Sequence, residues 1–209
     1  YSDDEAINQF ADLSDVITFE FENIPYETLN KINKIKSVIP HPSVNKIIQN
    51  RLFEKNFINK LNIKTTQYTS IKKESEIFEN QKFLPGILKT CTLGYDGKGQ
   101  HKINSVNDIK NLTVNYNNDY ILEKLVKLKK EISVIITRFK SKQYEIYEPF
   151  ENIHEDQILK NSKIPADISK ENFEKSKLWT AKISEELDYV GTLCVEFFID
   201  NEDILYVNE

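Results

Sequence analysis

Along this chain, short runs of β-branched and aromatic residues alternate with segments whose apolar residues recur every three or four positions. The runs predict strands, and the periodic segments predict amphipathic helices. In the first half the pattern predicts a short helix at 74–79 and strands at 15–21, 64–69, 87–90 and 100–103. Another helix is predicted after Pro25, with Leu29 and Ile32 on one face. We expect Ser43 to cap one continuous helix that runs to about Leu61.

The second half of the chain is richer in predicted strands. The first three, at 120–126, 132–138 and 144–148, are joined by short basic links, so an antiparallel meander is the simplest arrangement. A helix is predicted at 172–187. The last segment predicts a hairpin, with strands at 192–199 and 204–207 around a turn at 200–203.

The segment Gly94-Tyr95-Asp96-Gly97-Lys98-Gly99-Gln100 lies between two of these strands. Asp-Gly is a common hairpin turn, so a plain hairpin explains it about as well as a ligand site does. Three glycines and a lysine exceed what a turn requires, and they would bring N–H groups and a cation close to a phosphate. We predict a flap over a nucleotide triphosphate. Lys89, just upstream, could hold phosphate oxygens, although most strand lysines are simply solvated.

Residues Glu123-Lys124-Leu125-Val126 have the pattern of an adenine-binding hinge. Such a hinge offers a backbone N–H and C=O from an extended segment beside an apolar wall. Leu125 and Val126 could supply these groups, and Glu123 could accept a hydrogen bond from the exocyclic amine. Any amphipathic strand has the same pattern, so the signal is weak by itself.

Glu196 and Glu209 lie on, or just past, the strands of the final hairpin and can fall on one face. Carboxylates this close repel each other unless a cation lies between them, and Mg²⁺ bridging nucleotide phosphates is the usual one. Asn208 adds another oxygen ligand. The alternative is a pair of exposed glutamates that point apart. The other isolated polar residues are each explained singly by a surface ion pair or a core histidine: Arg51, Glu131, Arg138 and His154.

Composition excludes several classes of protein. The 209 residues carry a net charge of -5, which gives no general attraction to nucleic acid or anionic lipid. No apolar run approaches the roughly 20 residues of a membrane helix. Cys91 and Cys194 lack metal-type spacing, which favours a reduced, cytoplasmic setting. Methionine is absent even at position 1, so we expect a fragment of a longer protein.

Several motifs occur in a fixed order: residues 15–25, Gln49-Asn50-Arg51, Leu88-Lys89-Thr90, residues 94–100, Glu123-Lys124, residues 130–133, Tyr189-Val190-Gly191 and Asn208-Glu209. With these motifs the chain resembles, over essentially its whole length, the 5-(carboxyamino)imidazole ribonucleotide synthases, ATP-grasp enzymes of purine biosynthesis. The resemblance implies an α+β ATP-grasp fold in which two lobes clamp ATP. It places the tail of a Rossmann-like preATP-grasp domain at 1–40, a small lobe at 41–122 and a large lobe at 123–209.

The same resemblance implies a reaction and its residues. ATP would phosphorylate bicarbonate to carboxyphosphate, and 5-aminoimidazole ribonucleotide would capture the carboxyl group. ATP contacts would come from Arg51, Lys89, Tyr95, Asp96, Gly97, Lys98, Gly99, Gln100, Glu123, Lys124, Leu125, Val126, Glu131, His154 and Asn208. Glu196 and Glu209 would hold Mg²⁺, while Lys98 and Arg138 would act on the transferred groups. The resemblance also suggests a homodimer, while the composition favours a cytoplasmic protein that binds neither nucleic acid nor a membrane.

The chain departs from the family pattern in ways that affect its expected activity. It lacks the glycine-rich turn that would hold the ribonucleotide phosphate, and it lacks the segment that follows Glu209 in the family. Cys91 stands where relatives often carry a basic residue. We therefore assign activity to a longer parent enzyme. Two alternatives remain: an ATP-grasp purine ligase that uses formate or glycine, and a non-catalytic nucleotide-binding module.

Overall fold

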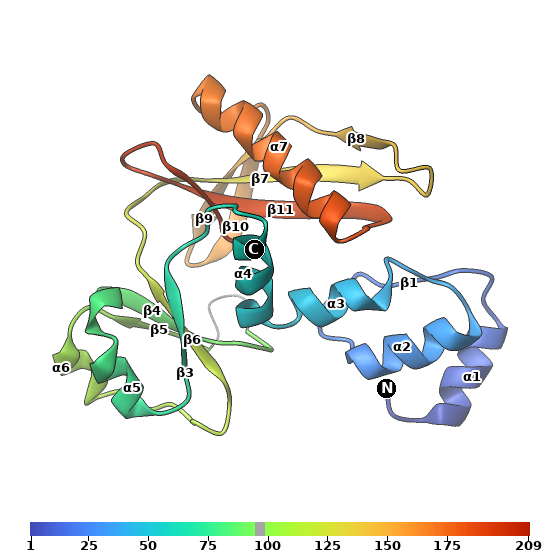
Figure 1. Ribbon diagram of the computed structural model, residues 1–209, viewed down its shortest axis with the longest axis horizontal. Coiled ribbons are helices and arrows are strands. Elements are labelled where there is room, and N and C mark those ends of the chain that lie inside the picture. Colours follow the sequence, from blue (N-terminus) through green and yellow to red (C-terminus); the bar gives the residue numbers. More distant parts are fainter. Residues whose placement is uncertain (95–98) are drawn as a thin grey trace.

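The structure is a computed structural model that describes residues 1–94 and 99–209. Figure 1 shows three parts: a mainly helical N-terminal part, a small sheet covered by short helices, and a large sheet with one long helix across it. Helix α4 lies between the two sheets (Figure 1). The mixture of helices with mostly antiparallel strands agrees with the predicted α+β class.

The N-terminal part contains α1 (Asp4–Asp12), β1 (Ile17–Thr18), α2 (Tyr26–Ile35) and β2 (Val38–Ile39). Its small core is formed by Ile7, Ala11, Ile17, Leu29, Ile32 and Val38. The predicted strand at 15–21 is too long, because β1 pairs only with the two residues of β2. Helix α1 was not predicted, although Asp3 caps it by accepting a hydrogen bond from the Ala6 N–H.

The predicted single helix from Ser43 to Leu61 is wrong. Two helices are present, α3 (Pro42–Ile48) and α4 (Arg51–Lys60). Asn50 has an extended backbone, with φ -129°, and its side chain accepts hydrogen bonds from the Leu52 and Phe53 N–H groups. Asparagine is a strong N-cap, so it starts a new helix here. The cap of α3 is His41 instead of Ser43.

The small sheet has the strand order β3-β6-β4-β5, and all its pairs are antiparallel. Its strands are β3 (Tyr68–Ile71), β4 (Gly86–Thr90), β5 (Gln100–Ile103) and β6 (Tyr120–Lys124), and it is accompanied by α5 (Glu74–Glu79), the 3₁₀ turn η1 (Gln81–Phe83) and α6 (Val106–Ile109). The predicted meander is therefore wrong for its first strand, because β6 belongs to this sheet. Ile121 and Leu122 are completely buried there, which suits a central strand.

The large sheet has the order β10-β9-β7-β11-β12, and β8 pairs with β7. Its strands are β7 (Leu128–Arg138), β8 (Tyr144–Ile146), β9 (Phe150–Glu155), β10 (Ile158–Lys163), β11 (Gly191–Asp200) and β12 (Leu205–Val207), and α7 (Lys170–Glu186) covers it. The predicted antiparallel hairpins β7–β8 and β11–β12 are both confirmed. Strands β9 and β10 were missed, because the residues of neither strand form an apolar run.

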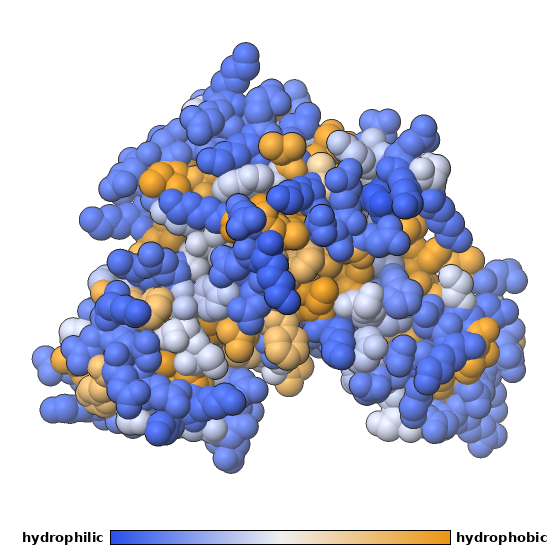
Figure 2. Space-filling model, viewed as in Figure 1, coloured by the Kyte–Doolittle hydropathy of each residue, from blue (hydrophilic) through white to orange (hydrophobic). Residues whose placement is uncertain are grey.

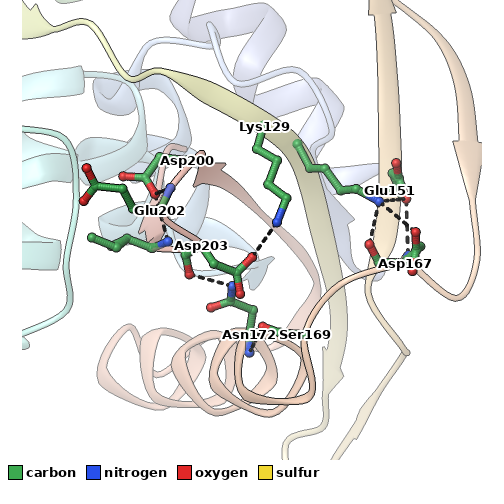
Figure 3. A network of polar contacts seen from close by, with 10 residues as sticks. Lys129, Glu151, Asp167, Ser169, Asn172, Asp200, Glu202 and Asp203 are labelled. Atoms are coloured by element: carbon green, nitrogen blue, oxygen red, sulfur yellow. Dashed lines mark hydrogen bonds and ion pairs between the residues drawn. The ribbon is translucent and has the colours of Figure 1, made fainter.

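The turn between β11 and β12 is fixed by polar contacts (Figure 3). Asp200 Oδ1 accepts hydrogen bonds from the Glu202 and Ile204 N–H groups. Asn172, at the start of α7, donates to the Asp203 carbonyl at 2.9 Å. Lys129 lies 3.0 Å from the Asp203 carboxylate. These contacts tie the turn to α7 and β7, which fixes the position of the hairpin that carries Glu196.

The visible surface is mostly hydrophilic, with apolar side chains gathered near the centre (Figure 2). Within the described residues, we find no helix with the length and apolar character needed to cross a membrane.

Candidate functional site

A cavity of about 640 Å³ lies between the two sheets. The small sheet contributes β4, β5 and β6, and the large sheet contributes β7, β9 and β11. The structure brings most of the predicted site residues to this cavity. Those that line it are Arg51, Lys89, Gln100, Glu123, Lys124, Leu125, Val126, Glu131, His154, Glu196, Asn208 and Glu209.

A buried ion cluster forms part of the cavity wall. Glu123 is only 3% exposed and lies between two lysines. Its Oε1 is 3.2 Å from Lys89 Nζ, and its Oε2 is 3.3 Å from Lys55 Nζ. Burial raises the pKa of Glu123, but Lys55 and Lys89 outweigh it and hold that pKa at about 2. Glu123 is therefore ionised and fixes Lys89 at the cavity wall.

These contacts give the Glu123 side chain a role that differs from the predicted one. It was predicted to accept a hydrogen bond from an exocyclic amine, but Oε2 already accepts one from Thr66 Oγ1 at 2.7 Å. Oε1 lies against Lys89. Both carboxylate oxygens are thus engaged by cations or a hydroxyl, which leaves hydrogen bonding at the hinge to the backbone.

The hinge backbone after β6 is partly paired. Lys124 N–H donates to the Gln67 carbonyl at 2.8 Å, and Leu125 N–H donates to the Pro85 carbonyl at 2.9 Å. Among the described residues, none accepts a hydrogen bond from the Val126 N–H. Because Val126 lines the cavity, this N–H is the donor available to a planar ring bound there.

Another part of the cavity wall is acidic. Glu196 N–H donates to the Glu209 carbonyl, and Asn208 N–H donates to the Glu196 carbonyl, both at 2.8 Å. Arg51 Nη1 lies 2.8 Å from Glu209 Oε1. Burial raises the pKa of Glu196, and repulsion from Glu209 and Glu131 raises it further. The predicted proximity of Glu196 and Glu209 is thus present in the structure.

This acidic end fits a magnesium ion better than a metal held by protein ligands alone. Across residues 1–94 and 99–209 there is no group of three or more histidine, cysteine, aspartate or glutamate side chains arranged to hold a metal. Mg²⁺ usually takes only one or two protein carboxylates and fills its remaining positions with water and phosphate oxygens. The repulsion felt by Glu196 is the kind that such a cation relieves.

Glu131 and His154 form a pair on neighbouring strands. Glu131 Oε2 lies 2.7 Å from His154 Nδ1, and both side chains are about one-quarter exposed. Burial raises the pKa of Glu131, whereas His154 and Lys89 lower it. The pair joins β7 to β9 in the wall of the cavity.

Arg138 is not part of this site. It lies at the other end of β7 from Glu131, where it pairs with Gly191 in the sheet. Its guanidinium donates to Asp188 Oδ1 at 3.0 Å and to the Tyr189 carbonyl at 2.9 Å. The residue is buried and does not line the cavity. The sequence showed that Arg138 follows Glu131 on one strand, but the length of that strand carries the two apart.

The predicted flap is only partly described. Tyr95, Asp96, Gly97 and Lys98 lie outside the described residues. Gly99 has φ +71°, and a Cβ there would come within 2.7 Å of Thr90 Oγ1, so glycine is required at this position. Gly99 does not line the cavity, whereas Gln100 does.

Several lining residues were not predicted: Thr66, Ile87, Lys102, Leu128, Gln157 and Phe198. Strand alternation could have identified three of them. Ile87 is two residues from Lys89, Lys102 two from Gln100, and Phe198 two from Glu196, so each shares a face with a predicted residue. Ile87 and Phe198 provide apolar surface, and Lys102 adds a third cation to the small-sheet wall.

Comparison with known proteins connects this geometry to a family of enzymes. An ATP-grasp domain model matches residues 56–209, and a ribonucleotide synthetase preATP-grasp domain model matches residues 1–49. The N5-carboxyaminoimidazole ribonucleotide synthase of Brucella melitensis is 37% identical over 214 residues, covering 100% of this chain and 59% of that enzyme. A crystal structure of an ADP complex of N5-carboxyaminoimidazole ribonucleotide synthetase superposes with a TM-score of 0.93 at 37% identity, covering 100% of this chain and 56% of that one.

A related structure carries a second ligand. The N5-carboxyaminoimidazole synthase of Aspergillus clavatus, in complex with ADP and 5-aminoimidazole ribonucleotide, superposes with a TM-score of 0.87 at 25% identity. The match covers 98% of this chain and 55% of that one. The chain therefore spans little more than half the length of the relatives it matches.

Proposed function

We propose that this chain, which belongs to the ATP-grasp family, binds ATP between its two sheets and forms part of a 5-(carboxyamino)imidazole ribonucleotide synthase. The enzyme would carboxylate 5-aminoimidazole ribonucleotide with bicarbonate and ATP, releasing ADP and phosphate. One observation carries the proposal: lysines from the small sheet and carboxylates from the large sheet face a single cavity. Its relatives are N5-carboxyaminoimidazole ribonucleotide synthases.

The residues that line the cavity suit both the base and the phosphates of a nucleotide triphosphate. The Val126 N–H, with Leu125 and Ile87 as apolar neighbours, would bind the adenine ring. Lys89, held by Glu123, would contact phosphate oxygens from the small-sheet side. Arg51, held by Glu209, would contact them from α4. Each cation is positioned by a carboxylate before the ligand arrives, so little rearrangement is needed on binding.

Glu196 and Glu209 would hold Mg²⁺, with Asn208 beside them, and the bound ion would neutralise charge on the phosphate oxygens. The protein's own contribution is to align the phosphates and exclude water. Carboxyphosphate is destroyed by water, so the predicted flap at residues 94–100, with Lys98, would cover it during transfer. Arg138 has no part in this step, because its guanidinium is engaged by Asp188 and Tyr189.

Phosphate release by the full-length protein tests the proposal. We expect release to require ATP, Mg²⁺, bicarbonate and 5-aminoimidazole ribonucleotide together. Dependence on formate or glycine in place of these acceptors would assign the chain to another ATP-grasp purine ligase. ATP binding without any phosphate release would indicate a nucleotide-binding module.

Other features of the protein remain predictions. These are the division at residues 40 and 122, the homodimer and the cytoplasmic location. Gel filtration with light scattering on the full-length protein would test the dimer.

A further inference from the structure

Lys55 is a buried cation to which the proposed reaction gives no role. Its side chain is 2% exposed, and it does not line the cavity. It lies on α4 one helical turn after Arg51, so the two cations share a face of the helix. Burying an ammonium group is costly unless it is paired and hydrogen-bonded. The contacts of Lys55 therefore indicate the function of its buried ammonium group.

The Lys55 ammonium joins three separate segments. It lies 3.3 Å from Glu123 Oε2 on β6, next to the hinge. It donates to Thr65 Oγ1 at 3.1 Å, and Thr65 Oγ1 in turn donates to the Val207 carbonyl at 2.8 Å. It also lies within hydrogen-bonding distance of the Asn208 carbonyl, at 3.3 Å. A lysine ammonium has three donors, and each has an acceptor here.

Two of these partners stand beside different parts of the proposed nucleotide site. Glu123 precedes the hinge that would bind the base, and Asn208 precedes Glu209, which would bind the metal. On its other side, the Asn208–Glu209 segment is held by hydrogen bonds to Glu196 and by the Arg51 ion pair. Within the described residues, Lys55 is the side chain that contacts both Glu123 and the Asn208 carbonyl.

We propose that Lys55 is a positioning residue that fixes the distance between the base-binding and metal-binding ends of the nucleotide site. This inference rests on the proposed function. Lys55 would act by orienting Glu123 and the Asn208 carbonyl, without touching the nucleotide or the metal. Partners that orient metal ligands in this way typically contribute about 10- to 100-fold to metal affinity when they are removed.

The test measures how strongly Mg²⁺ increases nucleotide affinity. Binding of the non-hydrolysable analogue AMPPNP to the full-length protein is measured by calorimetry with Mg²⁺ and with EDTA, and the ratio of the two dissociation constants is compared between variants. In Lys55→Met we expect the ratio to fall about tenfold. Lys55→Arg should recover part of it. Lys60→Met, on an exposed position of the same helix, is the control and should keep the wild-type ratio.

A purely structural role predicts a different result. If Lys55 only stabilises the fold, Lys55→Met weakens binding equally with and without Mg²⁺, and the unchanged ratio overturns the proposal. If Lys55→Met does not fold, Thr65→Val decides in its place, because it removes one acceptor of the ammonium and leaves every charge paired. A lowered ratio in Thr65→Val supports the proposal, and an unchanged one overturns it. Wild-type protein that binds no AMPPNP, or binds it without regard to Mg²⁺, would refute the proposed function and this inference with it.

Discussion

Replacing Glu123 by glutamine removes the anion that two lysines share. Glu123 is almost completely buried, so solvent screens its interactions with Lys55 and Lys89 very little. The pKa of Glu123 is lowered from its ordinary value of 4.5 to about 2, because the two lysines outweigh the effect of burial. At about 1.36 kcal/mol for each unit of pKa, that difference corresponds to roughly 3 kcal/mol of stability at neutral pH. It agrees with the roughly 3–5 kcal/mol expected when a buried ion pair loses one partner.

The pH dependence of this contribution has a definite sign. The carboxylate has a lower pKa folded than unfolded, so its contribution is fully present above about pH 4.5 and is lost as the pH falls toward 2. We therefore expect Glu123→Gln to lower the free energy of unfolding by roughly 3 kcal/mol at pH 7. The difference between variant and wild type should shrink toward pH 2.

Urea unfolding measures this directly. The single tryptophan, Trp179, packs against the large-sheet core and reports fluorescence, while circular dichroism follows the helices. The control is Glu145→Gln on β8, an exposed glutamate that forms no ion pair with any described residue. A loss below about 1 kcal/mol at pH 7, or the same acid dependence in Glu123→Gln and wild type, would refute the assignment of a shared, buried carboxylate.

Three further predictions address other groups. Burial and Glu209 raise the pKa of Glu54 from 4.5 to about 8, so its stabilising contribution is lost as the pH rises through this range. Glu54→Gln should therefore raise the free energy of unfolding at pH 9 by roughly 5 kcal/mol, and urea titrations showing no gain would contradict this. Glu209→Gln should reduce Mg²⁺-dependent phosphate release by the full-length enzyme at least about tenfold, and near-normal turnover would exclude the metal role. Arg138→Met should lower the melting temperature yet leave the KM for ATP within about twofold, whereas a selective loss of kcat would return Arg138 to the reaction.

Local patterns predicted those parts of the fold that depend on neighbours in sequence. The helix at 74–79 and the hairpin around Asp200 were confirmed, because periodicity and turn residues decide both. Local patterns could not predict to which sheet β6 belongs. Its strand character is local, but its place between β3 and β4 depends on partners at least 30 residues away. For Asn50 the opposite holds. Its capping signal was present in the local sequence, but the prediction of one continuous helix gave more weight to the apolar pattern on both sides of it.

The prediction of the candidate site shows the same difference between local and long-range information. Lys89, Glu123 and the Glu196–Glu209 pair were predicted from local patterns that are weak by themselves and that the family resemblance made specific. Lys55 was missed, since a lysine inside an amphipathic helix has the same pattern whether it is solvated or buried. Arg138 was placed in the site because it shares a strand with Glu131, and only the sheet register showed that it lies at the other end. Sequence motifs name chemical groups, and the three-dimensional arrangement decides which of them meet.

Helix α4 presents Arg51 and Lys55 toward the site and packs Ile58 into the core of the large sheet. A change in that core, such as trimming Ile58, would tilt the helix and displace both cations together. If the chain has the proposed function, a screen for loss of growth without purines would score such a variant as a catalytic mutant, although Ile58 does not line the cavity. Genetic maps of this protein should therefore show a second group of inactivating positions inside the molecule, following the buried side of one helix.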